Sequence, residues 1–183
     1  MEYFDIVDIQ GKPTGERASR ADVHKYGYVH RAVHIWIYRM KNKHYELLLQ
    51  KRSANKDSHP SCYDMSCAGH VSAGDDYLQS ALRELQEELG VTIKDYQLKE
   101  LFIYPIHYQK YFHNQLFIEN EINQAYACML DLETEHFILQ EEEVESLRWV
   151  PFEQLESFMR TYPHCIIEDE LNRVMKWVNN HEI

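Results

Sequence analysis

The chain has 183 residues, 44% of them hydrophobic, and a formal net charge of −11. That length can bury one core, and the acidic balance excludes a surface that coats nucleic acid. Four cysteines without a CxxC pair predict no disulfide framework, and the segment MEYFDIVD lacks the features of a signal peptide. No apolar run approaches about 18 residues, so we expect a cytoplasmic protein that does not insert into a membrane.

Alternating apolar residues and turn-forming residues predict a mixture of strands and helices along the chain. The expected strands cover residues 4–9, 31–38, 46–51, 63–67, 97–104, 122–130 and 146–150. A turn is expected at residues 11–15, a loop at 55–61, and helices at 152–160 and 167–179. Mixed strands with helices on both sides predict an α/β/α sandwich.

The most informative segment is residues 69–91, GHVSAGDDYLQSALRELQEELGV, which has the pattern of one amphipathic helix. Its leucines recur at helical spacing and form an apolar stripe that packs on a core; they are Leu78, Leu82, Leu85 and Leu89. Asp75 and Asp76 fit the start of the helix as caps, and Gly90 fits just past its end. We therefore expect a well-delimited helix with one side on the core.

Three carboxylates lie on the opposite side of this helix, because Glu84, Glu87 and Glu88 fall within roughly 100° of arc. We expect them to face solvent or a cleft. Like charges this close repel one another, and a bound divalent cation would relieve the repulsion. Carboxylate oxygens suit Mg²⁺ or Mn²⁺, and a solvated acidic face is the alternative.

As a whole, the segment resembles the Nudix box. The matching positions are Gly69, Arg83, Glu84, Leu85, Glu87, Glu88, Gly90 and Val91. Asp75 stands where the family usually has Glu, which keeps the charge but shortens its reach. The resemblance implies a Nudix-type α/β/α sandwich with a mixed β-sheet, formed as a single domain over residues 1–183 with the box at 69–91.

The resemblance also implies the chemistry. The residues that would hold Mg²⁺ or Mn²⁺ are Glu84, Glu87 and Glu88, with the Gly69 carbonyl as a further ligand. Arg83 would orient a carboxylate. The expected reaction is hydrolysis of a diphosphate linkage in a nucleoside diphosphate derivative or related organic pyrophosphate, by metal-activated water. The general base stays open among Glu87, Glu88 and the acidic run at 141–143.

Other segments resemble isopentenyl-diphosphate isomerase, an enzyme with the Nudix fold. They are FDIVDIQGKPTG, HKYGYVHRAVHIWIY, CAGH, and ENE at residues 119–121. This resemblance implies a second divalent metal site built from His30, His70, Glu119 and Glu121, and His24 fits only if a one-residue gap is allowed. Imidazole together with carboxylate suits a transition metal or Zn²⁺ better than Mg²⁺.

One position favours hydrolysis over isomerisation. The isomerases have Cys directly before the Gly that opens the box, and here that residue is Ala68. Cys67 lies one residue earlier, and on a strand a shift by one residue turns a side chain to the opposite face. We therefore expect a pyrophosphohydrolase from the isomerase-like branch. The alternatives are an isopentenyl-diphosphate isomerase and a non-catalytic ligand-binding module.

Specificity and partners are less defined. Residues 104–117, YPIHYQKYFHNQLF, predict either a stacking surface for a nucleobase or a strand pair packed on the core. Lys51, Arg52 and Lys56 either reach substrate phosphates or are solvated. The expected partner is a small-molecule diphosphate, with no nucleic-acid polymer and no membrane, and a homodimer is left open.

Overall fold

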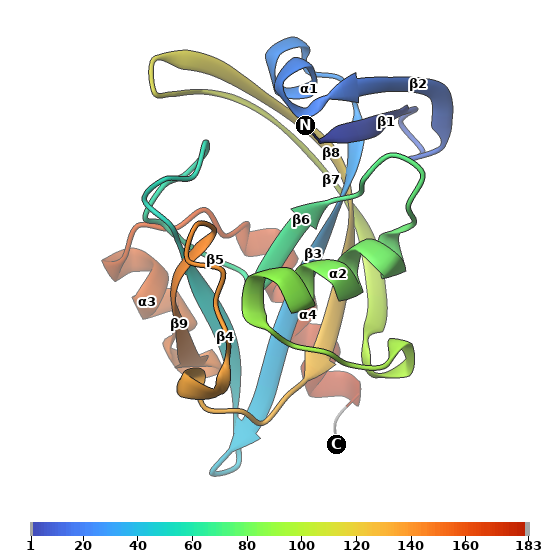
Figure 1. Cartoon of the computed structure of the whole chain (residues 1–183). Coiled ribbons are helices and arrows are strands. Elements are labelled where there is room, and N and C mark those ends of the chain that lie inside the picture. Colours follow the sequence, from blue (N-terminus) through green and yellow to red (C-terminus); the bar gives the residue numbers. More distant parts are fainter. Residues whose placement is uncertain (1, 182–183) are drawn as a thin grey trace.

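The computed structural model describes residues 2–181, which form a two-stranded sheet beside a seven-stranded sheet (Figure 1). The small sheet pairs β1 (Tyr3–Val7) with β2 (Pro13–Ser19). The strands of the large sheet are β3 (His30–Lys41), β4 (His44–Arg52), β5 (Tyr63–Asp64), β6 (Cys67–His70), β7 (Lys99–Phe112), β8 (Gln115–Met129) and β9 (Val144–Pro151). The helices are α1 (Arg20–Tyr26), α2 (Tyr77–Leu89), α3 (Leu155–Thr161) and α4 (Glu168–His181).

Strand β3 lies at the centre of the large sheet, whose order is β5-β4-β3-β8-β7, with β6 also on β3 and β9 on β4. β3 and β8 run parallel, and the other pairs are antiparallel. Along one edge, β3 pairs with β6 at residues 32–35 and with β4 at residues 38–41. The sheet therefore forks at β3, with β6 and β4 as its two arms (Figure 1).

The hydroxyl of Ser66 lies where β4 leaves β3. Its Oγ accepts a hydrogen bond from the Ile37 amide of β3 at 2.7 Å and donates one to the Leu48 carbonyl of β4 at 2.6 Å. Ser66 is fully buried, and its side-chain hydrogen bonds connect the two strands where the backbone pairing of β3 with β4 ends. The predicted continuous strand at 63–67 is thus wrong at its centre, because β5 and β6 belong to different arms of the fork.

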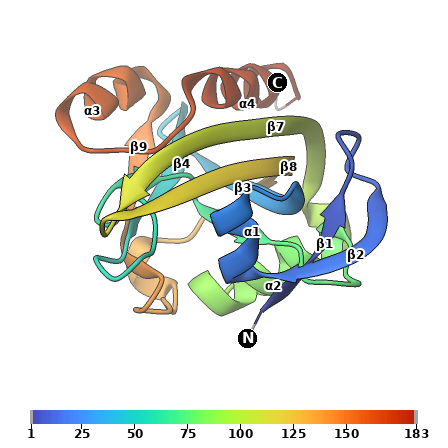
Figure 2. The ribbon, with the colours of Figure 1, turned by 90° about the horizontal axis from the view of Figure 1, so that it is seen from above.

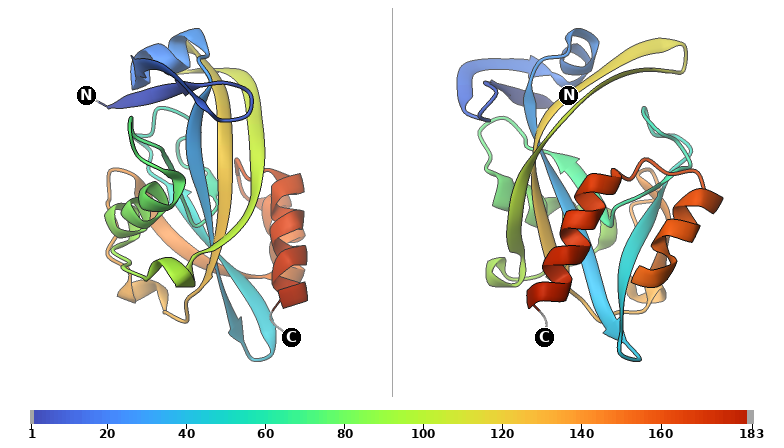
Figure 3. Two further views of the ribbon diagram at one scale, coloured as in Figure 1. Left: turned by 90° about the vertical axis from the view of Figure 1, so that its right-hand side faces the viewer. Right: turned by 180° about the vertical axis from the view of Figure 1, so that it is seen from behind.

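Helices cover both faces of the sheet, with α2 on one face and α3 and α4 on the other (Figure 3). Successive side chains of β3 point to opposite faces of the sheet, so this strand packs against the helices on both sides. Ile35 packs in the cluster that contains Leu85 of α2, and Trp36 packs in the cluster that contains Leu171 of α4. The α/β/α sandwich with a mixed sheet is confirmed. Within residues 2–181, no helix is long and apolar enough to cross a membrane.

Helix α2 has the ends that the sequence predicts, because its signals are local. The Asp76 carboxylate, rather than that of Asp75, caps the helix by accepting the Gln79 amide at 2.8 Å. Gly90 ends the helix with φ 67, a left-handed conformation that glycine adopts without a steric penalty.

The N-terminal region and the β7–β8 hairpin differ from the predictions. Residues 11–15, expected to be a turn, contain the start of β2, and α1 follows, capped by Ser19, which accepts the Asp22 amide at 3.2 Å. β7 and β8 extend beyond the predicted strands and turn at His113 and Asn114, both with positive φ. The hairpin leaves the sandwich and passes beside α1, which contacts β8 (Figure 2).

The Ser66→Ala substitution tests the role of the hydroxyl at the fork. It leaves a buried amide of β3 and a buried carbonyl of β4 without a partner, so we expect the free energy of unfolding to fall by about 1–3 kcal/mol. Urea denaturation measures the change. Ser157→Ala is the matched control: its exposed hydroxyl bonds only to the Gln154 carbonyl of the preceding turn, so the expected change is below about 0.5 kcal/mol. Equal losses in the two variants would contradict this role.

Candidate active site

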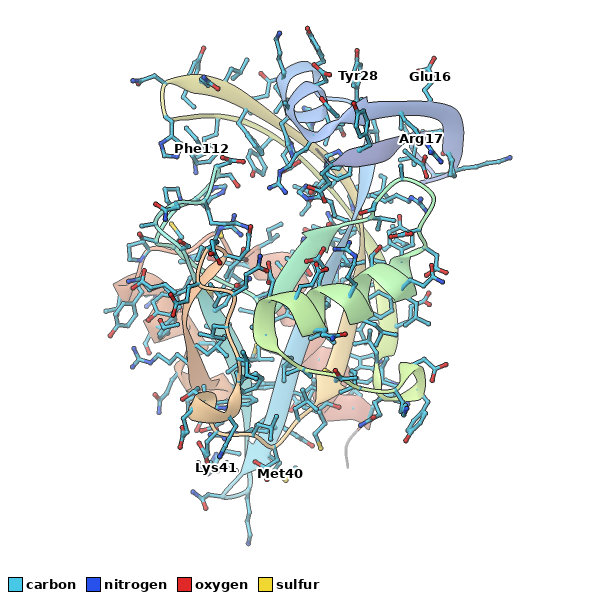
Figure 4. The ribbon with its side chains drawn as sticks, in the orientation of Figure 1. Glu16, Arg17, Tyr28, Met40, Lys41 and Phe112 are labelled. Carbon is cyan, nitrogen blue, oxygen red and sulfur yellow. The ribbon has the colours of Figure 1, made fainter. Side chains whose placement is uncertain are left out.

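A cavity of about 630 Å³ opens between the arms of the fork. Its walls come mainly from α2, β3, β6, β7, β8, the loop after β4 and residues 164–167 before α4. The β7–β8 hairpin reaches to this loop, where the ring centroids of Phe112 and His59 lie 4.7 Å apart (Figure 4). Tyr108 and Phe117 of the hairpin line the cavity, and Tyr111 is exposed. The outer part of residues 104–117 therefore borders the cavity and is not packed on the core.

The carboxylates of α2 differ in their exposure. The Glu84 side chain is 11% exposed and Glu88 is buried, whereas the Glu87 side chain is 53% exposed at the rim. Glu84 lies directly against the backbone of β6: a Cβ on Gly69 would stand 2.1 Å from its carboxyl carbon. Glycine at position 69 therefore makes room for this carboxylate.

Burial governs the protonation of the two inner carboxyls. It raises the pKa of Glu84 to about 8, with a further increase from the negative charge of Glu88. It also raises the pKa of Glu88 to about 7, although the positive charge of Lys56 opposes it. Oε2 of Glu88 has no hydrogen-bond partner among the described residues. An unpartnered buried oxygen beside a second carboxylate fits a divalent cation such as Mg²⁺ or Mn²⁺.

Arg83 connects α2 to β6. Its Nη1 lies 2.9 Å from Oε1 of Glu84 and 3.0 Å from Oε2 of Glu87, and its Nη2 donates to the His70 carbonyl at 3.1 Å. The guanidinium group thus holds the Glu84 carboxylate against β6 and draws Glu87 towards the rim. Asp75, which stands at the position where the family usually has Glu, does not line the cavity.

Basic and acidic side chains from two loops also reach the cavity. Arg52 and Lys56 line it, whereas Lys51 pairs with Glu145 at 2.6 Å outside it. Of the acidic run at 141–143, only Glu143 lines the cavity, where it pairs with Lys56. Although burial opposes the effect, the contact with Lys56 lowers the pKa of Glu143. Arg20 of α1 lines the cavity as well, and the sequence analysis gave no signal for it.

A second set of donors lies on the other face of β6. One ligand atom each from His24, His30, His70 and Glu119 lies within 4.8 Å of the others. Oε1 of Glu121 is 3.5 Å from Nε2 of His30 and 3.4 Å from Nε2 of His70. The structure therefore brings together the four residues of the predicted second site. It adds His24, which matches the isomerase pattern only with a one-residue gap.

Two neighbours fix the orientation of these imidazole rings. Nδ1 of His30 lies 3.0 Å from the Tyr28 carbonyl, an arrangement in which Nε2 presents its lone pair to the carboxylates. Phe4 stacks on the ring of His70 with a centroid distance of 4.6 Å. Burial lowers the pKa of His70 to about 3, although Glu121 opposes this, so the imidazole is neutral.

Two further properties of this set are the pKa values of its carboxyls and its buried atoms without hydrogen-bond partners. Burial acts to raise the pKa of both carboxyls and prevails at Glu119; at Glu121, contacts with His30 and His70 outweigh it and lower the pKa. Nε2 of His30, Nε2 of His70 and Oε1 of Glu119 have no hydrogen-bond partner among the described residues. Imidazoles together with carboxylates and unpartnered donor atoms fit Zn²⁺ or a divalent transition metal.

Cys67 and Ala68 point in opposite directions. β6 pairs with β3 without a register shift, so that Cys67 lies opposite Ile35 and Ala68 opposite His34. Cys67 is buried in the core on the side of α2, whereas Ala68 lines the cavity. Burial, followed by the charge of Glu88, raises the pKa of the Cys67 thiol well above its usual range. It is therefore a protonated core residue and not a nucleophile.

The fold and the carboxylate helix define a class, and the comparisons agree with it: residues 29–170 match the model of the NUDIX domain, and the chain belongs to the Nudix family. It is 42% identical over 174 residues to Nudix hydrolase 3 of Arabidopsis thaliana, which covers 93% of this chain but 22% of that protein. The chain thus spans about a fifth of the length of this relative.

Two further similarities bear on the family and on the fold. The chain is 32% identical over 162 residues to isopentenyl-diphosphate Delta-isomerase 2 of Photorhabdus laumondii, covering 88% of this chain and 84% of that one. Among solved structures, the protein DR0079 of Deinococcus radiodurans has the same fold, with a TM-score of 0.69 and 20% identity over 89% of this chain and 92% of that one.

The raised pKa values of Glu84 and Glu88 predict how stability depends on pH. The folded, metal-free protein keeps protons on these carboxyls up to about pH 8 and 7, whereas the unfolded chain loses them near 4.5. The folded state binds more protons at these carboxyls, so the free energy of unfolding should fall as the pH rises from 7 to 8, once the unfolded chain has lost most of the His70 proton. His34, whose pKa is raised to about 9, adds a fall of the same sign.

Urea denaturation at several pH values measures this slope. The Glu84→Gln/Glu88→Gln double variant should have a shallower slope, and Mg²⁺ should flatten the slope of the unmodified protein because the cation binds the ionised carboxylates. An identical slope in the double variant would contradict the assignment.

Proposed function

We propose that the protein is a divalent-metal-dependent hydrolase that cleaves the diphosphate linkage of a nucleoside diphosphate derivative or a related organic pyrophosphate. The observation that carries the proposal is the pair Glu84 and Glu88, buried together in one wall of a ligand-sized cavity. Membership of the Nudix family and the Nudix hydrolases among the relatives support it. Mg²⁺ or Mn²⁺ is the metal we propose for this wall.

Each residue of the box then has a role. Glu84 and Glu88 bind the metal, the Gly69 carbonyl is a candidate further ligand, and Glu87 contributes from the rim. Arg83 orients the Glu84 carboxylate through its bridge to β6. The bound cation acidifies water and neutralises phosphate charge. Other residues of the cavity supply cations for the phosphate oxygens; they are Arg20, Arg52 and Lys56.

Glu143 is our candidate for the general base. It lines the cavity, and its contact with Lys56 keeps it ionised at neutral pH. Glu84 and Glu88 are required as metal ligands, and a base must be able to accept a proton from the attacking water. Glu143 meets this requirement without leaving the metal one ligand short.

A second divalent metal, Zn²⁺ or a transition metal, is proposed for the histidine and glutamate set. The same set gives support to a second candidate function, isopentenyl-diphosphate isomerisation, as does the relative from Photorhabdus laumondii. Against isomerisation stand Ala68 at the cavity wall and Cys67 in the core. The intact pair of Glu84 and Glu88 favours an enzyme over a non-catalytic module.

Phosphorus NMR tests the proposed reaction. The purified protein is incubated with Mg²⁺ and a pooled set of nucleotide sugars, dinucleotides, nucleoside triphosphates and isopentenyl diphosphate. New phosphate resonances from hydrolysis are the expected result, and they identify the substrate. Conversion of isopentenyl diphosphate to its dimethylallyl isomer without cleavage of any member would replace the hydrolase by the isomerase.

The Glu88→Gln substitution tests the metal assignment. It keeps the size of the side chain but removes the charge, so turnover should fall by at least about a hundredfold while the fold is retained. The rate at which the phosphomonoester products appear in the phosphorus NMR spectrum measures the effect, and circular dichroism monitors the fold. Glu141→Gln, an exposed change in the acidic run outside the cavity, is the control and should keep full activity. Unchanged turnover in Glu88→Gln would refute the assignment.

The His30→Gln substitution tests the second metal. Removal of one imidazole donor should weaken Zn²⁺ or Mn²⁺ binding by at least about tenfold, because losses of that size follow even from changes behind the ligands. Metal content after dialysis against a chelator, measured by mass spectrometry, reports the change. His107→Gln, an exposed histidine of β7, is the control. Equal metal content in the two variants would show that the set holds no metal.

A further inference from the structure

His34 is a buried histidine at the cavity wall that belongs to neither donor set. It lies on β3 opposite Ala68 of β6, and both residues line the cavity. His30 lies four residues earlier on the same strand, which corresponds to about 13 Å along an extended chain. His34 therefore stands deeper in the sandwich than the histidine and glutamate set, on the side that α4 covers.

Glu170 of α4 fixes the ring of His34. Its two carboxylate oxygens lie 3.0 and 2.9 Å from Nδ1 of His34, and its Oε1 also accepts the indole N–H of Trp36 at 2.9 Å. Glu170 is fully buried, so its negative charge needs a cationic partner, and His34 provides one. With Nδ1 held by the carboxylate, Nε2 on the other edge of the ring is the nitrogen available to a ligand.

The charge of this pair decides what Nε2 can do. Burial acts to lower the pKa of His34, but the charge and hydrogen bond of Glu170 outweigh it and raise the pKa to about 9. A protonated imidazole has no lone pair, so it serves neither as a metal ligand nor as a general base. It is a hydrogen-bond donor with a positive charge, and donors of this kind bind anionic oxygens strongly.

We propose that His34 is a specificity-determining residue that donates from Nε2 to an anionic oxygen of the substrate outside the cleaved diphosphate. The inference rests on the proposed function and narrows its substrate class. The expected substrates are diphosphates whose attached group carries a phosphoryl or carboxylate oxygen. Diphosphates of plain hydrocarbons fall outside this class.

The walls around His34 favour this selection. Apolar side chains line the same cavity on the side of α4; they are Met65, Ile106 and Ile166. His34 is the charged donor beside these apolar groups, and an anionic oxygen placed against them instead would lose its hydration without a replacement. Arg52, which also lines the cavity, is already paired with Asp64 at 3.1 Å. Glu170 acts through His34 and is a positioning residue.

Matched ligand pairs test the proposal. UDP-glucuronate and UDP-glucose differ by a carboxylate, and ATP and ADP differ by a phosphoryl group, so the two pairs distinguish the two sources of an anionic oxygen. Binding is measured by calorimetry in the Glu88→Gln background, which stops turnover. We expect at least one anionic member to bind roughly tenfold to a hundredfold more tightly than its partner, the range for a hydrogen bond to a charged group.

The variant that removes this preference is His34→Phe combined with Glu170→Gln. Phe keeps a planar ring, and Gln avoids leaving a buried carboxylate without its cation. We expect the preference to disappear while the affinity for UDP-glucose or ADP stays the same. If this variant does not fold, nitrogen NMR of labelled histidine in the unsubstituted chain replaces it. Both ring nitrogens of His34 should be protonated at neutral pH, and Nε2 should shift on addition of the preferred ligand.

The outcomes separate the two proposals. A preference that persists in the double variant, no preference in either pair, or an Nε2 signal that does not move would each overturn the role of His34. None of these results depends on hydrolysis. Absence of new phosphate resonances with the unsubstituted protein would instead refute the proposed function and leave the binding result standing.

Discussion

The side chain of Ser66 sets the geometry on which the active site depends. Its hydroxyl bonds to β3 and β4 together, so that β4 leaves β3 at this point and β6 takes the edge that becomes available. A regular sheet would close this edge with backbone hydrogen bonds and leave no opening. The fork instead opens a cavity whose walls are mostly strands and a helix, and such elements hold functional side chains more firmly than loops do.

Burial of ionisable groups follows from this geometry. Glu84 and Glu88 lie on one side of β6, and Glu119 and Glu121 lie with their histidines on the other. Buried charges destabilise a folded chain unless they are paired. The cation proposed for each set would supply the missing partner, so the contacts that weaken the metal-free fold would be those that favour metal binding. With Mg²⁺ the effect would extend to the substrate, because phosphate oxygens would complete its coordination.

The sequence predicted α2 in detail because its stripe, caps and carboxylates are encoded within a few turns. It did not predict α1, because the preceding β2 has no apolar alternation and the helix is only seven residues long. His24 of this helix was only partly recognised, because it matches the isomerase pattern only with a one-residue gap. The pair of His34 and Glu170 joins residues 136 positions apart, and such a contact leaves no periodic pattern in a single sequence. Ser66 was hidden for a related reason, since a lone polar residue does not show that two strands separate around it.

Alternation along β6 separates two chemistries within one cavity. Gly69 faces α2, where all the charged ligands are carboxylates, whereas Ala68 and His70 face the side of α4, where imidazoles gather. At Ala68 the wall carries a methyl group instead of a thiol, which removes the group that the isomerases place there and leaves more room beside His34. The same residue thus supports the proposed hydrolase over the isomerase. It also leaves the wall beside His34 lined by a small side chain, which suits the role proposed for the His34 imidazolium.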